Sequence, residues 1–229
     1  MLARYATRFN AVEINSSFYR PHQRKTYERW AATVPADFRF AVKLPQTISH
    51  EHALQRCGPL LDALVEQVAG LGDKLGALLL QLPPGLLFEA RVASTFFALL
   101  RRRTDAPVAC EPRHASWFGA RAEALLAQHH VARVAADPAR LPEAALPGGN
   151  RRWQYWRWHG SPRMYYSEYS QAALAALAAR VRANGGRLPA WVIFDNTAHG
   201  FAVSDAARLQ ALMAESAPIA TFPRKRGKG

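Results

Sequence analysis

The chain alternates between short apolar runs and longer amphipathic segments. Seven runs are rich in apolar, β-branched or aromatic residues and are each followed by turn residues, a pattern typical of β-strands. From the first run to the last is 180 residues in six steps, a mean spacing of 30, which is the length of one strand-plus-helix unit. The runs are centred near Val12, Phe40, Leu79, Cys110, Arg133, Arg157 and Val192.

The segments between these runs repeat apolar residues at spacings of three and four, which predicts helices at 54–69, 89–100, 120–128, 170–182 and 205–213. Ser170 and Ser204 are suitable N-caps, and Asn184-Gly185-Gly186 is a suitable helix end. We expect the segment 142–150 to be a loop. Strands that alternate with helices predict a parallel sheet covered by helices.

The regular spacing favours an α/β fold of one particular kind. Seven strands with no glycine-rich nucleotide fingerprint after the first favour a TIM-type (β/α) barrel over a doubly wound sheet. Closure of such a barrel takes eight strands, and a helix-like segment at 2–9 directly precedes the first run. One strand is therefore missing, and an open barrel would leave two unpaired edges. We expect one barrel domain over residues 1–222 and a basic, disordered tail over 223–229.

Composition narrows the class of protein. The chain has 229 residues, of which 49% are hydrophobic and 21% charged, enough for one sizeable core. No stretch reaches the roughly 18 apolar residues of a membrane span, and the first residues lack the apolar run of a secretion signal. Cys57 and Cys110 are too few for a disulfide framework. We expect a cytoplasmic protein without a membrane partner, of undetermined oligomeric state.

The net charge of +13 points to anionic partners. Arginine binds phosphate and carboxylate groups well, so phosphorylated metabolites and nucleic acid are both candidates. The four cations of the tail, Arg224, Lys225, Arg226 and Lys228, could hold nucleic acid loosely. The alternative is a compositional bias in which most arginines are simply solvated.

Polar residues gather where the predicted strands end. In parallel barrels the chemistry lies at the carboxyl ends of the strands, so these residues are the candidate ligand-binding and catalytic groups. Acids buried there need nearby cations to offset the loss of solvation. The candidates are Glu13, Asn15, Tyr19, Lys43, Gln81, Glu111, Arg113, His114, Trp117, Asp137, Arg157, His159, Asp195 and Asn196.

Residue chemistry suggests roles for some of these groups. If the protein is an enzyme, which the sequence leaves open, Glu13 and Glu111 would share general acid and base work and His159 would move protons. The cations Lys43, Arg113 and Arg157 would hold a phosphate or carboxylate, and Gln81 and Asn196 would orient the ligand. Such a site fits hydrolysis or isomerisation of a phosphorylated or sugar-like molecule.

Two alternatives stay open. One is a nucleic-acid-binding protein or a metal-dependent phosphodiesterase of the barrel endonuclease type; the other is a scaffold whose ion pairs only stiffen the barrel. Carboxylates and histidines at the strand ends could supply a divalent metal site. However, the neighbouring cations would compete for those carboxylates, and no tight ligand spacing such as His-Glu-x-x-His occurs. We therefore assign no metal ligand, and the cofactor is unknown.

Several segments along the chain carry distinctive residue patterns. They are RFNAVEINSSFY (8–19), FRFAVK (38–43), LGDKLG (71–76), LQLPP (80–84), EPRHASWF (111–118), RWHG (157–160) and FDN (194–196) with Gly200. Together these segments resemble the YecE-like family of proteins of unassigned function with a TIM-type barrel. The resemblance covers nearly the whole chain and implies this fold and these candidate positions, but no reaction. Members of the family usually open with a strand carrying a Gly-Thr-Ser-Gly-Trp-like segment, which is not found here, so we expect either a start upstream of Met1 or loss of the first strand.

Overall fold

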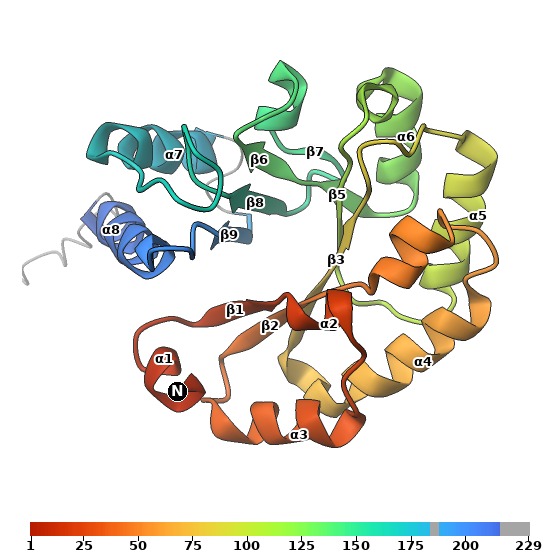
Figure 1. The fold of residues 1–229 in the computed structure, drawn as a ribbon, viewed down its shortest axis with the longest axis horizontal. Helices are drawn as coiled ribbons and strands as arrows, with labels where there is room; N and C mark the ends of the chain where they lie inside the picture. Colours follow the sequence, from red (N-terminus) through yellow and green to blue (C-terminus); the bar gives the residue numbers. More distant parts are fainter. Residues whose placement is uncertain (184–187, 216–229) are drawn as a thin grey trace, which may run out of the picture.

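The structure, a computed structural model, describes residues 1–183 and 188–215 (Figure 1). The helix end predicted at 184–186 and the predicted tail at 223–229 lie outside these residues. The strands are β1 (Ala11–Ile14), β2 (Arg39–Lys43), β3 (Leu75–Gln81), β4 (Val108–Glu111), β5 (Val131–Arg133), β6 (Ala135–Asp137), β7 (Gly148–Gly149), β8 (Gln154–Trp158) and β9 (Ala190–Phe194). The helices are α1 (Leu2–Ala6), α2 (Ser16–Tyr19), α3 (Arg24–Thr33), α4 (Gly58–Val68), α5 (Ala90–Arg101), α6 (Ala120–Gln128), α7 (Gln171–Ala183) and α8 (Phe201–Glu215).

The strands form two sheets that share one extended segment. The first has the order β1-β2-β3-β4-β5-β7, parallel throughout except that β7 runs antiparallel to β5; the second has the parallel order β6-β8-β9. Only Val134 separates β5 from β6, and its N–H donates to the carbonyl of Cys110 at 2.8 Å. The α/β class is therefore confirmed. Within residues 1–183 and 188–215, β1 and β9 are not paired, and no closed barrel is found.

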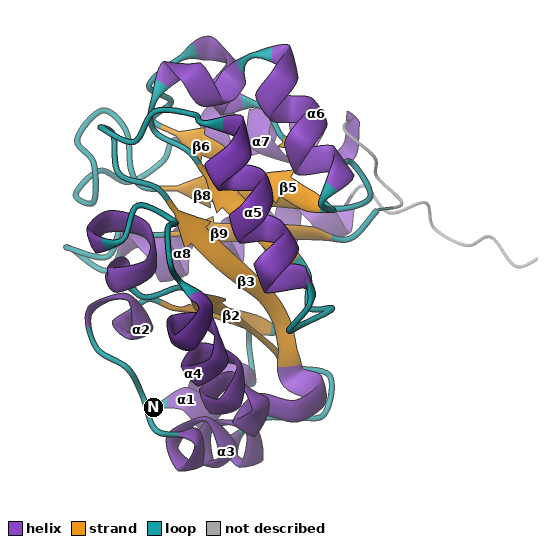
Figure 2. Cartoon of the chain, turned by 90° about the vertical axis from the view of Figure 1, so that its right-hand side faces the viewer, coloured by secondary structure: helices purple, strands orange, loops and turns teal. Residues whose placement is uncertain are grey.

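Alternate residues of each strand face opposite layers, as the period of two requires. Phe40 and Val42 of β2 face the helices and belong to the same cluster as Leu61 of α4 and Phe96 of α5. Figure 2 shows α4 and α5 lying over β2 and β3 on this side. The other face, which we call the inner face, joins small residues of β2–β5, such as Ala41 and Ala109, to large rings of β8 and β9.

Aromatic rings fill the inner face opposite those small residues. The rings of Tyr155 on β8 and Trp191 on β9 stack with centroids 5.9 Å apart and an interplanar angle of 8°. Trp153 packs edge-on against Tyr155 at 5.9 Å. Alanines on four neighbouring strands leave the space that these rings occupy, so the two halves of the inner face are complementary in size.

All seven predicted strands are present, and the helices differ from prediction mainly at their ends. The helix predicted from 54 begins at Gly58, because Leu54 and Arg56 adopt φ values of +67° and +53°, which a helix does not allow. The last helix begins at Phe201 rather than 205, so Ser204 lies inside it and bonds back to the carbonyl of Phe201. Ser170 accepts from the N–H of Ala173 at 3.2 Å, as its predicted capping role requires.

Some segments escaped prediction. The helices α2 and α3 were not predicted, and α3 is rich in charged residues. The segment 142–150, predicted as a loop, contains a helical turn at Pro142–Ala145 and the two-residue strand β7. The carboxylate of Glu123 explains why β7 forms. It accepts a hydrogen bond from the N–H of Gly149 at 2.6 Å and also pairs with Arg133 of β5, so it holds β7 beside β5.

Candidate functional site

The inner-face positions at the carboxyl ends of the strands are polar and lie together. Because side chains alternate, only every second residue of a strand end can point to this face. These positions, with Arg113 beside them, are called the mouth cluster below. Its members are Glu13 of β1, Lys43 of β2, Gln81 of β3, Glu111 of β4, Arg157 and His159 at the end of β8, and Asp195 after β9.

Arg157 is the centre of the cluster, and its side chain is 1% exposed. It grips Glu13 in a bidentate manner, with Nε donating to Oε2 at 3.1 Å and Nη2 to Oε1 at 2.8 Å. Nη1 donates to Glu111, and Nη2 lies 3.4 Å from Oδ2 of Asp195. These carboxylates hold the pKa of Arg157 well above its usual value, even though burial alone would lower it.

Glu111 is held in its charged form by the cations around it. Burial alone would raise the pKa of this carboxyl, but Arg157, His159 and Arg113 lower it well below its usual value. Arg113 donates to Oε1 through Nε at 3.1 Å and through Nη2 at 2.9 Å. A permanently ionised carboxylate is a poor proton donor, so Glu111 is suited to orient and stabilise positive charge rather than to act as an acid.

His159 and Asp195 form a pair in which one imidazole nitrogen is anchored and the other is not. Nδ1 lies 3.1 Å from Oδ2 of Asp195. Nε2 is buried, has no hydrogen-bond partner among the described residues, and lies 3.8 Å from Oε1 of Glu111, beyond hydrogen-bonding range. Burial opposes protonation, but the two carboxylates prevail and raise the pKa of His159. The protonated imidazole is therefore favoured more strongly than in a free histidine.

Lys43 differs from the guanidinium groups of the cluster. Its Nζ lies 3.9 Å from the ring centroid of Phe18, and the residue is 6% exposed. Burial and the neighbouring charge of Arg157 lower its pKa to about 8, although Glu111 and Glu13 act in the opposite direction. The backbone at this position is fixed, because Ser17 Oγ donates to the carbonyl of Lys43 at 2.7 Å.

Tyr155 belongs to the site but was not predicted as a site residue. Its hydroxyl donates to Oε2 of Glu13 at 2.8 Å, and burial together with that carboxylate raises its pKa well above the usual value. A usable signal was present, since Tyr155 lies two residues before Arg157 and therefore on the same face of β8. Gln81 is a weaker member, with Oε1 3.5 Å from Nη1 of Arg157.

Several predicted site residues lie outside the cluster. Asp137 and Asn196 occupy the opposite parity, so they turn to the helix side, where Asp137 accepts from Tyr169 and Asn196 donates to Asp205. Tyr19 is 73% exposed on the surface. Two more follow β4: His114 bonds to Ser116 within its own turn, and Trp117 is 1% exposed and donates to the carbonyl of Leu86.

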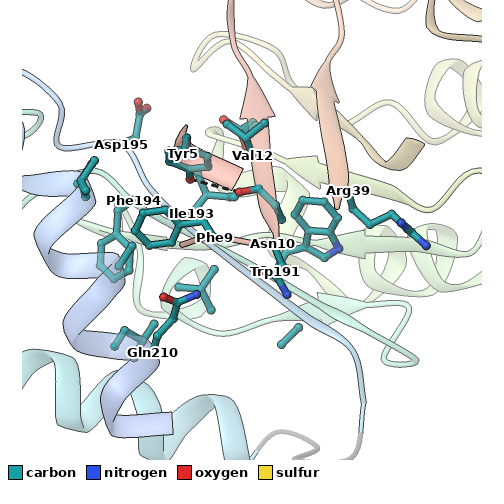
Figure 3. A pocket seen from close by; sticks show the side chains of 18 of the residues that line it. Tyr5, Phe9, Asn10, Val12, Arg39, Trp191, Ile193, Phe194, Asp195 and Gln210 are labelled. Atoms are coloured by element: carbon teal, nitrogen blue, oxygen red, sulfur yellow. Dashed lines mark hydrogen bonds between the residues drawn. The ribbon is translucent and has the colours of Figure 1, made fainter. Parts of the chain in front are cut away.

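Two cavities adjoin the cluster. The larger, about 670 Å³, is a groove between β1 and β9, walled by α1 and α8 (Figure 3). Aromatic and apolar side chains such as Phe9, Trp191 and Phe194 line most of it, while Glu13, Asn15 and Asp195 line its polar end. The side-chain oxygen of Asn15 is buried there without a partner among the described residues.

The smaller cavity, of about 30 Å³, lies on the other side of the cluster. Its wall includes His159 and Glu111 together with two guanidinium side chains, Arg113 and Arg140. Two cations beside a protonatable imidazole make this the part of the mouth with the chemistry to receive an anion.

The described residues contain no group of three or more His, Cys, Asp or Glu side chains that could hold a metal ion. The carboxylates of the mouth cluster are instead engaged by arginine. No helix in the described ranges is long and apolar enough to cross a membrane.

Comparison with known proteins shows what this chain is similar to. It is 38% identical to the UPF0759 protein YecE of Escherichia coli K12 and of E. coli O157:H7 over 82 residues, which is 36% of this chain and 30% of each relative. A DUF72 family protein from Enterococcus faecalis V583 superposes with a TM-score of 0.81 at 22% identity, over 93% of this chain and 88% of that one. A DUF72 family protein from Thermotoga maritima MSB8 gives a TM-score of 0.76 at 23% identity, over 90% and 85%.

The YecE-like resemblance of the sequence is confirmed. The sequence profile of the family described as "Protein of unknown function DUF72" matches residues 1–227. The match extends over more than nine-tenths of the 229 residues. The chain therefore belongs to the DUF72 family of proteins of unknown function.

Proposed function

We propose that the protein binds a small anionic or sugar-like molecule at the mouth cluster and exchanges a proton with it through His159. One observation carries the proposal: Nε2 of His159 is a buried, protonatable nitrogen that has no hydrogen-bond partner among the described residues and faces Glu111 only at 3.8 Å, in the wall of a cavity that also presents Arg113 and Arg140. Buried polar atoms are usually hydrogen-bonded, so such an atom in a cavity wall marks a ligand position.

The surrounding groups fit a division of roles. Asp195 orients the imidazole through Nδ1, as the carboxylate does in an acid–base dyad. Arg113 and Lys43 supply positive charge for the anion. Arg157 is saturated by carboxylates, so it positions Glu13 and Glu111 and does not reach a ligand itself. Hydrolysis or isomerisation of a phosphorylated or sugar-like molecule remains the reaction class that this set supports.

A scaffold without chemistry is the competing function, and one observation favours it. The side chains of Glu13, Arg157 and His159 are only 1–3% exposed, so most of the mouth is dry and ion-paired. Nε2 of His159 and the ammonium of Lys43 make no side-chain hydrogen bond among the described residues, which argues against a fully satisfied network. The nucleic-acid alternative depends on the net charge and on the tail at 223–229, which lies outside the described residues.

The test follows the NMR signals of the His159 ring while inorganic phosphate, citrate, ribose 5-phosphate and uncharged ribose are added. At least one anionic probe is expected to shift those signals and to raise the melting temperature. His159→Gln and Arg113→Met should abolish the rise, while His52→Gln, at an exposed histidine, should keep it.

Two results would overturn the proposal. One is folded protein in which no probe perturbs His159; this result would leave the scaffold. The other is a pair of folded variants, Glu13→Gln and Lys43→Met, that bind every metabolite as the unaltered protein does. Salt-steep binding of DNA or RNA that depends on the 223–229 tail would instead support the nucleic-acid function.

We also infer that the parallel strands belong to a single TIM-type barrel domain, of cytoplasmic location, with one strand missing between β9 and β1. Both strands line the same groove, and each lacks a second neighbour among the described residues. Glu13 illustrates the open edge of β1. Its side chain is 1% exposed, yet the residue as a whole is only half-buried, so the exposed part is its backbone, as expected at an unpaired strand edge. Measurement of amide exchange along β9, argued in the Discussion, tests this inference.

A further inference from the structure

The cations of the mouth cluster are not equivalent, and only one of them is an amine. Arg157 and Arg113 each make hydrogen-bonded ion pairs with carboxylates. Lys43 makes no ion pair and no side-chain hydrogen bond among the described residues, although it lies in the same cluster. The charges that act on it are those of Arg157, Glu111, Glu13 and Arg113, and its own charge acts on His50.

We infer that Lys43 is a nucleophile that forms a Schiff base with a small anionic aldehyde or ketone bound at the mouth. The inference rests on the proposed ligand site and names its substrate class. An amine attacks a carbonyl only when it is neutral, and lysines reach that form near neutral pH when they are desolvated or lie beside another cation. Lys43 meets both conditions, because it is 6% exposed and two guanidinium groups act on it.

Two contacts hold the side chain of Lys43 in the mouth cluster. Its strand end is anchored by Ser17, and the ring of Phe18 faces the ammonium at 3.9 Å. An aromatic face stabilises a cation without consuming a lone pair or a proton, so it supports both the ammonium and the iminium that would replace it. A carboxylate bound directly to the ammonium would instead keep the amine protonated.

The step balances with groups already present. The neutral Nζ adds to the carbonyl carbon; the carbonyl oxygen takes a proton from the His159 imidazolium, and the positively charged nitrogen returns one to the imidazole, which leaves a neutral carbinolamine. The hydroxyl then takes a proton from the imidazolium and leaves as water as the nitrogen lone pair forms the C=N bond, so the net step uses one proton and yields a protonated imine. His159 is the proton donor of the cluster, because the neighbouring carboxylates raise its pKa and favour the protonated imidazole, whereas Glu111 stays ionised beside its cations.

The charge around Lys43 indicates an anionic carbonyl compound. Arg157 is shared among three carboxylates and 1% exposed. Within the part of the chain that the structure describes, Arg113 bonds to Glu111 alone, and its side chain is 20% exposed. A carboxylate or phosphate group close to the carbonyl would lie beside Arg113 and offset the positive charge next to Lys43. Small keto acids and phosphorylated ketoses or aldoses have this arrangement.

The test traps the imine with borohydride. The full chain is incubated at neutral pH with pyruvate, with dihydroxyacetone phosphate, or with uncharged dihydroxyacetone, then reduced, digested and analysed by mass spectrometry. The five lysines, Lys25, Lys43, Lys74, Lys225 and Lys228, fall on distinguishable positions of the sequence. A reduced adduct with at least one anionic probe is expected on Lys43 at least about tenfold faster than on the exposed Lys25, and more slowly with the uncharged probe.

Labelling of Lys43 no faster than that of Lys25 would overturn the inference. If phosphate or citrate still perturbs His159 in that case, the proposed binding function stands and only the Schiff base fails; if neither result is obtained, both fail. Lys43→Arg keeps a cation but has no nucleophilic amine, so it should lose the adduct. Should that variant not fold, the mapping on the unaltered chain still decides.

Discussion

Among residues 1–183 and 188–215, the guanidinium of Arg157 is the one cation that forms an ion pair with Glu13. The Glu13 side chain is 1% exposed, so without Arg157 its carboxylate would keep only the hydroxyl of Tyr155 in a site shielded from water. A buried ion pair adds little net stability compared with an apolar pair, but removal of one partner leaves an uncompensated charge. Burial thus distinguishes the Arg157–Glu13 pair from surface ion pairs of similar geometry.

Arg157→Met is therefore expected to lower the free energy of unfolding by about 3–5 kcal/mol. Arg24→Met is the matched control: Arg24 pairs with Glu28 at 3.0 Å, but both side chains are about half exposed, so the loss should stay below about 1 kcal/mol. Urea denaturation monitored by tryptophan fluorescence measures both. A loss for Arg157→Met as small as that for Arg24→Met would contradict the burial assigned to the cluster.

Lys43 should make stability depend on alkaline pH. Its pKa is about 8 in the folded chain and near 10.5 when unfolded, so between these values the unfolded chain binds more protons and stability rises with pH. Below about pH 8 both states are protonated and the fold carries the full cost of the buried ammonium. That cost is about 3 kcal/mol, since one pKa unit corresponds to about 1.4 kcal/mol.

The comparison with Lys43→Met isolates this effect. The variant should be more stable than the unaltered protein at neutral pH, and its advantage should shrink as pH rises from about 8 toward 10.5. Denaturation curves at a series of pH values, with Lys25→Met as the exposed control, measure the difference. A difference that does not change across this window would show that the ammonium of Lys43 is not desolvated.

At the scale of the elements, the short strand β7 depends on a glycine. Gly149 has φ = +62°, and a Cβ there would lie 3.0 Å from Cβ of Leu126 and close to the carbonyl of Val131. A side chain is therefore unfavourable both for the backbone and for the packing against β5 and α6.

Gly149→Ala is expected to cost about 1–3 kcal/mol and to increase amide exchange in the segment 142–149. Gly85→Ala is the control, because no heavy atom lies within 4 Å of the added Cβ and the φ of Gly85 is not in the left-handed region. Its effect should stay within about 0.5 kcal/mol. Equal stability of the two variants would show that the pairing of β7 with β5 does not constrain this segment.

The elements also show which information the sequence contains. Strand positions were predictable because each is a compact apolar run, and this holds for β2 as for β9. The division of residues 131–137 into β5 and β6 could not be predicted, because it depends on the neighbouring strand, which changes from β4 to β8 at Val134. The candidate site could be predicted only in part. Proximity to a strand end selects both Glu111 and Asp137, whereas the alternation of side chains along a strand selects Glu111 and excludes Asp137.

At the scale of the whole molecule, the two outer strands share an unusual environment. Strands β2, β4 and β8 are almost wholly buried, whereas most residues of β1 and β9 are only partly buried. The strand count predicts two free edges, and neither β1 nor β9 has a second strand neighbour among the described residues. What lies in the groove between them could not be predicted from local patterns, because those patterns report on residues within the chain and not on their partners.

Hydrogen exchange along β9 can determine whether the groove side is open. The N–H of Asp195 donates to Trp158, and the carbonyl of Pro189 accepts from Gln154, so odd-numbered residues of this strand bond to β8. In a parallel ladder the even-numbered residues then direct their N–H groups to the other edge, which is the groove. The amides of Val192 and Phe194 should therefore exchange at least about tenfold faster than that of Ile193 between them. Equal protection of all three would show that another strand occupies the groove and completes the sheet.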